Sequence, residues 1–134
     1  MKNIFTICCV IMLFGSCSPH GMPVKEKMLI NKSYVHLFFE TQKECMDSQP
    51  DPDFFINCHQ QVDFYKDNVV DIMLSDIYYR GTYQIFGNLV VLTFEPGPEI
   101  PDGEIVFEMI NPAKLLHLEH GNVWKKVSGN SVWE

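Results

Sequence analysis

Short, regularly spaced strand patterns fill most of this chain and constrain its fold more than any other feature. From Gln61 onward, apolar and polar residues alternate over short runs, as expected of half-buried β-strands. Turn residues separate the runs. The clearest are Gly87 and Asn88, since both tolerate a positive φ and suit a two-residue hairpin turn. The predicted strands cover residues 33–40, 61–65, 69–74, 81–86, 89–94, 104–110, 115–119 and 123–127.

This succession of hairpins predicts an all-β fold. No segment has the apolar periodicity of a helix longer than two turns, and short strands joined by tight turns are typical of an antiparallel barrel or a sandwich. Consecutive hairpins favour the barrel, because closing the sheet removes its exposed edges. We therefore expect a small antiparallel meander barrel of about eight strands.

The N-terminal residues have the three parts of an export signal. Lys2 supplies a positive charge, residues 4–14 are apolar but too short for an ordinary transmembrane span, and two small residues precede Cys17. This arrangement resembles the lipobox of bacterial lipoproteins, with Phe14 where leucine is usual. The resemblance implies cleavage before Cys17 and attachment of a lipid such as palmitate to this cysteine. No acidic run follows Cys17, so we expect an outer-membrane anchor that faces the periplasm.

The sequence therefore divides into three predicted parts. Residues 1–16 form the signal peptide, and residues 17–31 contain the lipidated cysteine and a tether with proline, glycine and mixed charge. Residues 32–134 form the barrel, which is one domain with a single hydrophobic core.

The charge of the chain is acidic. Lys and Arg number 10 against 17 Asp and Glu, which gives a formal net charge of −7, and removal of Lys2 with the signal peptide makes the mature chain more acidic still. This balance argues against nucleic acid as a partner, because phosphate binding needs clustered Lys and Arg. It suits a cationic partner, and it is equally explained by solubility.

Two cysteines remain after Cys17 in the mature chain. Cys45 and Cys58 flank a proline-rich acidic stretch, and an even number of cysteines in an exported protein predicts a disulfide. The alternative is a thiolate metal site that includes His59, but the chain lacks the C-x-x-C spacing that favours one.

One predicted turn carries candidate ligand-binding residues. Asp76 and Arg80 flank two tyrosines at the expected rim of the barrel, where an acid, a base and aromatic rings could hold a ligand. An ion pair between Asp76 and Arg80, capped by the tyrosines, explains the same residues structurally. The candidate ligand-binding set is Asp76, Tyr78, Tyr79, Arg80 and Tyr83.

No catalytic motif is present, and we expect neither enzyme activity nor a cofactor. The alternation around Leu116 and Leu118 predicts that His117 points outward, where it could join Glu119 and His120 in a surface metal site. Solvated histidines beside a hairpin are the commoner explanation, so we expect no metal.

The central hairpins carry a recognisable arrangement of residues. It consists of Phe64, the turn at Asp67-Asn68, Gly81-Thr82-Tyr83, the turn at Gly87-Asn88 and Leu92-Thr93-Phe94. This arrangement resembles the small lipocalin-like barrels of bacterial lipoproteins, among them the N-terminal domain of the copper-stress lipoprotein NlpE. The similarity covers roughly residues 61–127, and this chain lacks the C-x-x-C pair that a copper or redox role of that relative would require.

Two functions are consistent with these features. The first is a non-enzymatic binding module, anchored in the envelope, for a small apolar ligand inside the barrel or for an envelope component. The alternative is a protein-interaction module, such as an inhibitor of a cationic host enzyme like lysozyme. An empty apolar interior favours the first, and a packed interior beside an exposed apolar patch favours the second.

Overall fold

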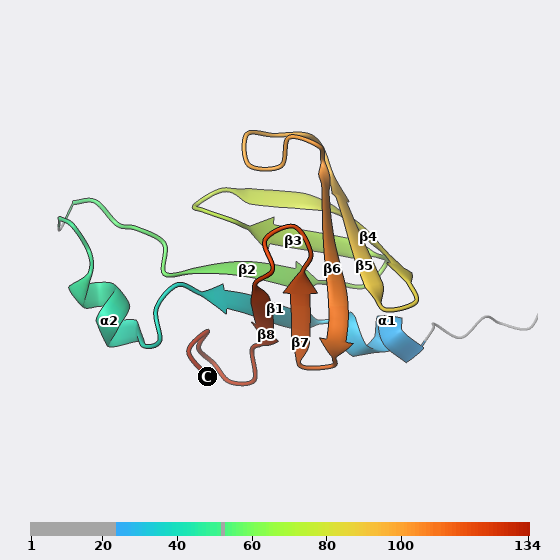
Figure 1. Cartoon of the computed structure of the whole chain (residues 1–134), viewed down its shortest axis with the longest axis horizontal. Coiled ribbons are helices and arrows are strands. Elements are labelled where there is room, and N and C mark those ends of the chain that lie inside the picture. Colours follow the sequence, from blue (N-terminus) through green and yellow to red (C-terminus); the bar gives the residue numbers. More distant parts are fainter. Residues whose placement is uncertain (1–23, 52) are drawn as a thin grey trace, which may run out of the picture.

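The chain folds into a closed barrel of eight antiparallel strands that follow one another around the barrel in sequence order (Figure 1), which confirms the predicted meander barrel. The computed structural model describes residues 24–51 and 53–134, so the predicted signal peptide and Cys17 lie outside the described residues. The elements are α1 (Val24–Leu29), β1 (Lys32–Leu37), α2 (Gln42–Asp47), β2 (His59–Phe64), β3 (Val69–Met73), β4 (Tyr78–Phe86), β5 (Leu89–Phe94), β6 (Glu104–Asn111), β7 (Lys114–His117) and β8 (Val123–Lys126). In this part of the chain, no helix is long and apolar enough to cross a membrane.

Two tight turns set the register of the central hairpins. Gly87 has a φ of 65° and joins β4 to β5, where Phe86 pairs with Leu89. Asp67 and Asn68 have φ values of 60° and 59° between β2 and β3, as a type I′ hairpin turn requires. Both turns fall where the sequence predicts them. A slip of one residue at either turn would move the core side chains of the hairpin to the solvent face.

Aromatic side chains fill the interior of the barrel. The ring of Phe64 meets Tyr34 and Tyr83 edge to face, with centroids 5.9 Å and 5.1 Å away, and Phe107 meets Trp124 at 5.2 Å. Each of these five rings is buried. Branched aliphatic side chains pack around them, so the interior is occupied by the protein's own residues. The most deeply buried are Trp124, Tyr34, Tyr83, Phe64, Phe107, Leu29, Ile72, Leu92, Leu115, Val62, Val70 and Val90.

The helix α1 corrects the predicted tether. Residues 24–31 were expected to lie outside the domain, but Leu29 at the end of α1 is fully buried in the barrel core. The backbone N–H of Asn31 donates to the carbonyl of Phe64 at 2.8 Å, and Lys25 donates to the carbonyl of Gly87 at 2.5 Å. The helix covers one end of the barrel (Figure 1), and the folded domain therefore includes residues from Val24 onward.

The seam that closes the barrel is short. Strand β1 pairs with β2 over six residue pairs, but with β8 over only two, Tyr34 with Lys126 and Val35 with Lys125. Beyond Val35 no further residue of β1 pairs with β8, although the rings of His36 and Trp124 still stack with centroids 6.3 Å apart. Packing of Tyr34 and Trp124 in the core, in addition to the ladder hydrogen bonds, holds this seam together.

The buried Tyr34 predicts an alkaline loss of stability. Its hydroxyl donates to the carbonyl of Pro112 at 2.9 Å, and burial raises the pKa of Tyr34 from 10.0 to about 12. The folded state therefore holds the phenol proton more tightly than the unfolded state. The contribution of the protonated phenol to the free energy of unfolding is complete below pH 10. It is lost as the pH rises toward 12, at up to about 1.4 kcal/mol per pH unit. Urea unfolding of the wild type and Tyr34→Phe over this range isolates the effect, since the variant should lose less stability on going alkaline. Equal slopes would contradict the assignment.

Candidate functional site

The loop between β1 and β2, residues 38–58, leaves the barrel and projects from one end of it (Figure 1). It carries α2 and the disulfide between Cys45 and Cys58, whose Cα atoms lie 5.8 Å apart. The predicted disulfide is therefore confirmed. The bond joins α2 to Cys58, the residue before β2, and so holds the helix close to the start of that strand.

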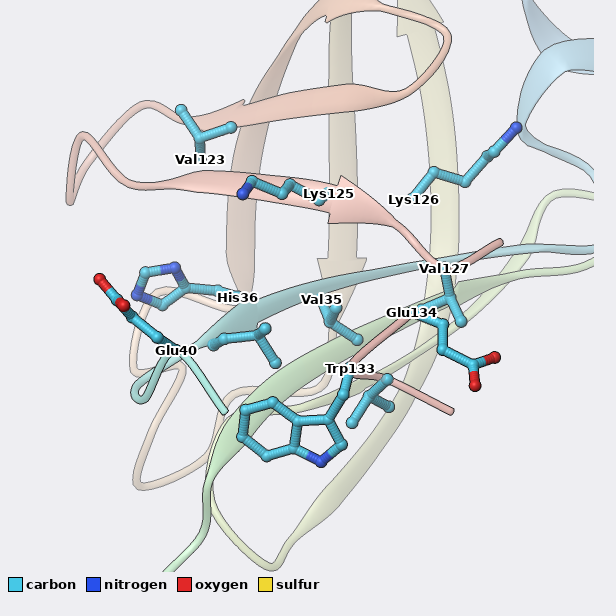
Figure 2. Close-up of a pocket in the computed structure, with 11 residues that line it drawn as sticks. Val35, His36, Glu40, Val123, Lys125, Lys126, Val127, Trp133 and Glu134 are labelled. Atoms are coloured by element: carbon cyan, nitrogen blue, oxygen red, sulfur yellow. The ribbon is translucent and has the colours of Figure 1, made fainter. Parts of the chain in front are cut away.

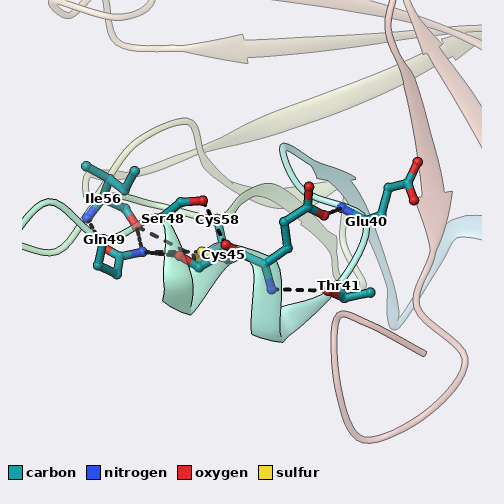
Figure 3. The surroundings of a disulfide bond; sticks show 8 residues. Glu40, Thr41, Cys45, Ser48, Gln49, Ile56 and Cys58 are labelled. Carbon is teal, nitrogen blue, oxygen red and sulfur yellow. Dashed lines mark hydrogen bonds between the residues drawn. A yellow bond between two sulfur atoms is a disulfide. The ribbon is translucent and has the colours of Figure 1, made fainter.

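Side-chain hydrogen bonds brace this loop further (Figure 3). Thr41 caps α2, because its hydroxyl accepts the N–H of Glu44 at 3.1 Å. Gln49 links the two arms: its amide nitrogen donates to the carbonyls of Cys45 and Ile56 at 3.0 Å and 3.3 Å, and its amide oxygen accepts the N–H of Ile56 at 2.8 Å. The loop thus keeps one conformation without strand pairing along its length.

The braced loop presents large apolar side chains to solvent. Met46 is 53% exposed, Phe54 62% and Phe55 63%. Together with Gln49, Pro50 and Asp51 they line a shallow hollow of about 360 Å³. Phe54 forms only an isolated bridge with Asp51, and both phenylalanine side chains are exposed. We call Met46, Phe54 and Phe55 the apolar tip.

The loop that carries the apolar tip is acidic. Within residues 38–58, the one basic residue is Lys43, and it pairs with Asp47. The remaining carboxylates have no cationic partner among the described residues. The loop therefore combines an exposed apolar tip with an excess of negative charge, and we call its carboxylates the acidic rim; of these, Asp51 lines the hollow itself. The acidic residues are Glu40, Glu44, Asp47, Asp51 and Asp53.

The turn between β3 and β4 lies against the same end of the barrel. The amide of Asn57 donates to the carbonyl of Ser75, and that of Gln60 donates to the carbonyl of Leu74 at 3.2 Å. These bonds hold the turn beside the base of the loop, and Figure 1 shows both at one end. Ile77 and Tyr78 are exposed there.

The structure does not bring the predicted rim residues to one point. Arg80 donates two hydrogen bonds of 2.8 Å to Asp71, its cross-strand neighbour, rather than pairing with Asp76. These bonds lower the pKa of the Asp71 carboxyl. The predicted Asp76–Arg80 ion pair is therefore wrong, because the register places Asp71 opposite Arg80 and leaves Asp76 in the turn.

The three tyrosines of the predicted set also diverge. Tyr78 is exposed, Tyr79 is half-buried against Gly97, and Tyr83 lies in the core with its hydroxyl 3.3 Å from the carbonyl of Tyr65. Strand alternation explains this, because residues 79 and 83 face inward while residue 78 faces outward. Of this set, Asp76, Tyr78 and Arg80 are exposed, and Arg80 is already paired with Asp71.

A second concave surface lies at the closure seam. It has a volume of about 500 Å³ and is lined by residues of β1, β8 and the C-terminal segment. Figure 2 shows Val123 and Lys125 of β8 on one side, His36 of β1 facing them, and Trp133 of the C-terminal segment on the other side of β1. Lysine and glutamate side chains line it together, so it has no dominant charge.

His117 is the clearest departure from the sequence expectation. It was predicted to point outward, but it is only 3% exposed and packs edge to face on Phe107 at 5.1 Å. Leu115 and His117 take the two inward positions of β7, and the apolar Leu118 is exposed instead. Burial lowers the pKa of the His117 imidazole, and the neighbouring His120 lowers it further.

None of the protein-family models, curated proteins or solved structures compared with this chain matches it.

Proposed function

We propose that this chain is a non-enzymatic, lipid-anchored module of the cell envelope that binds a basic protein through the apolar tip and its acidic rim. The observation that carries the proposal is that exposed aromatic side chains lie on a loop that a disulfide and several hydrogen bonds hold in place. A preorganised loop loses little conformational entropy on binding, and aromatic residues dominate the energetics of many protein interfaces.

The filled interior supports a partner at the outer surface. The rings of Tyr34, Phe64, Tyr83, Phe107 and Trp124 occupy the space that a small apolar ligand would need. An exposed apolar patch beside a packed core is typical of protein interaction sites.

The negative charge of the loop favours a positively charged partner. The loop that carries the apolar tip has five carboxylates and a single lysine, in a chain whose formal net charge is −7. Such a rim attracts a basic surface and accelerates association with it at low salt. A cationic enzyme of the lysozyme type has the matching charge.

Binding of lysozyme to the full-length protein at low salt tests the proposal. The double variant Phe54→Ser/Phe55→Ser should weaken binding by about tenfold or more, since burial of each aromatic anchor contributes about 1 kcal/mol or more. Affinity should also fall as salt rises, because the acidic rim acts through screened charges.

Phe86→Ser is the matched control. Phe86 is 58% exposed, similar to the two loop residues, but belongs to the β4–β5 hairpin. It should leave binding unchanged. An equal loss in both variants, or no saturable binding of lysozyme, would overturn this form of the proposal.

The membrane anchor is a separate part of the proposal and rests on the sequence that ends at Cys17. Cys17→Ala should leave the signal segment uncleaved and the protein without lipid, which moves it out of the outer-membrane fraction. Cell fractionation and intact-mass measurement report both effects. Normal partitioning of Cys17→Ala into the outer-membrane fraction would contradict the anchor and leave the interaction surface unaffected.

A further inference from the structure

The turn between β7 and β8 gathers three potential metal ligands. His117 ends β7, and Glu119 and His120 follow in the turn. Each offers one ligand atom, and these atoms all lie within 4.8 Å of one another. The two imidazole rings stack with centroids 4.6 Å apart. The turn is closed by hydrogen bonds from Gly121 N–H to the His117 carbonyl at 2.8 Å and from His117 N–H to the Asn122 carbonyl at 2.9 Å.

One of the three ligands is held in place by the core. The His117 side chain is buried against Phe107, and its Nδ1 accepts the backbone N–H of His120 at 3.1 Å. Glu119 and His120 are exposed and can adjust toward it. The cluster therefore combines a fixed buried ligand with two movable ones.

The surrounding cavity favours a cation. It has a volume of about 310 Å³, and four carboxylates line it, with no lysine or arginine among its described lining residues. One oxygen of Glu99 is buried and has no hydrogen-bond partner within residues 24–51 and 53–134. A buried carboxylate oxygen without a partner is costly, and a nearby cation would offset that cost. The four are Glu99, Asp102, Glu104 and Glu119.

We propose that His117, Glu119 and His120 bind a divalent transition-metal ion such as Zn²⁺ at this end of the barrel, with the carboxylates of the cavity as its electrostatic surroundings. Two imidazoles and a carboxylate are the ligand types that select Zn²⁺ over Ca²⁺ and Mg²⁺, which prefer oxygen ligands alone. This site differs from the sequence expectation that the protein binds no metal, and it is independent of the apolar tip.

Binding requires a small local rearrangement. Ligand atoms bound at about 2.1 Å around a tetrahedral ion lie about 3.4 Å apart, so the exposed side chains must move inward by on the order of 1 Å. One ring nitrogen of each histidine and one carboxylate oxygen of Glu119 would contact the metal. The site should therefore bind more weakly than a preformed structural zinc site, in the micromolar range.

Calorimetric titration of the metal-free full-length protein with ZnCl₂ tests the proposal. The expected result is one ion per chain, a rise in melting temperature with Zn²⁺, and NMR shifts at the His117 and His120 rings and the His120 amide. His120→Ala and Glu119→Gln, both at exposed positions, should weaken binding by about tenfold or more. Glu99→Gln should weaken it less, because it removes one negative charge that lines the cavity without removing a ligand.

His20→Ala, which removes a histidine outside the described residues, is the matched control and should leave Zn²⁺ affinity unchanged. Millimolar Ca²⁺ or Mg²⁺ should not displace Zn²⁺. Absence of saturable Zn²⁺ binding, or equal affinity of the wild type and His120→Ala, would overturn the site. Neither result depends on lysozyme binding, so failure of this proposal is distinguishable from failure of the proposed function.

Discussion

Gly81→Ala should destabilise the folded barrel by about 3 kcal/mol or more, because the added methyl group has no space between two strands. A Cβ at residue 81 would lie 2.1 Å from the carbonyl oxygen of Thr93 and 2.6 Å from a ring carbon of Phe94. Gly81 pairs with Val70 on one side and with Phe94 on the other. The clash therefore cannot be relieved by a side-chain rotation and must displace backbone in the middle of the sheet.

Gly87→Ala provides the matched comparison. A Cβ at residue 87 would meet nothing within 4 Å, so its cost comes only from the positive φ of 65° and should be about 1 kcal/mol. Urea unfolding, followed by the fluorescence of the buried Trp124, measures both variants. Equal losses in the two would show that the strand contacts of Gly81 do not limit stability.

Removal of the disulfide should have the second large effect. The double variant Cys45→Ala/Cys58→Ala should lower the free energy of unfolding by about 3 kcal/mol, because the bond closes a loop that makes few contacts of its own with the barrel. It should also weaken lysozyme binding, since Phe54 and Phe55 would no longer be held in one arrangement. Reduction of the wild type should reproduce both losses.

The outcome that contradicts this prediction is specific. If the double variant unfolds at the wild-type urea concentration and binds lysozyme with the wild-type affinity, then the hydrogen bonds of Gln49 alone hold the loop. Gln49→Ala in the disulfide-free background would then release it. In either case the barrel strands should remain, because the bond lies outside the sheet.

The strands and turns could be predicted from the sequence because each depends on local chemistry. Alternating apolar residues mark the inward face of β4 and β5, and Asp67, Asn68 and Gly87 adopt the positive φ that their turns require. The disulfide followed from the pair of cysteines that remains after Cys17 once an export signal is assumed.

The wrong predictions have three different causes. The short helix α1 has too few residues for a visible apolar period, so only the structure shows Leu29 in the core. Around His117 the sequence pattern favours the wrong face of the strand, because the apolar Leu116 and Leu118 alternate with His117 and are the more obvious residues to bury. The Arg80–Asp71 pair, in contrast, could have been predicted from the sequence, since it follows from the register of the β3–β4 hairpin.

The short seam between β1 and β8 has a consequence for how the protein reaches its folded state. Tyr34 and Lys126 pair with each other although most of the sequence lies between them. The barrel therefore cannot close until nearly the whole chain is available. Contacts of such long sequence separation form late and slow the folding of β proteins. Until β8 docks, one edge of β1 is unpaired and able to add a strand from another chain. The time spent before closure, more than the stability of the finished barrel, should therefore decide how much of this protein aggregates.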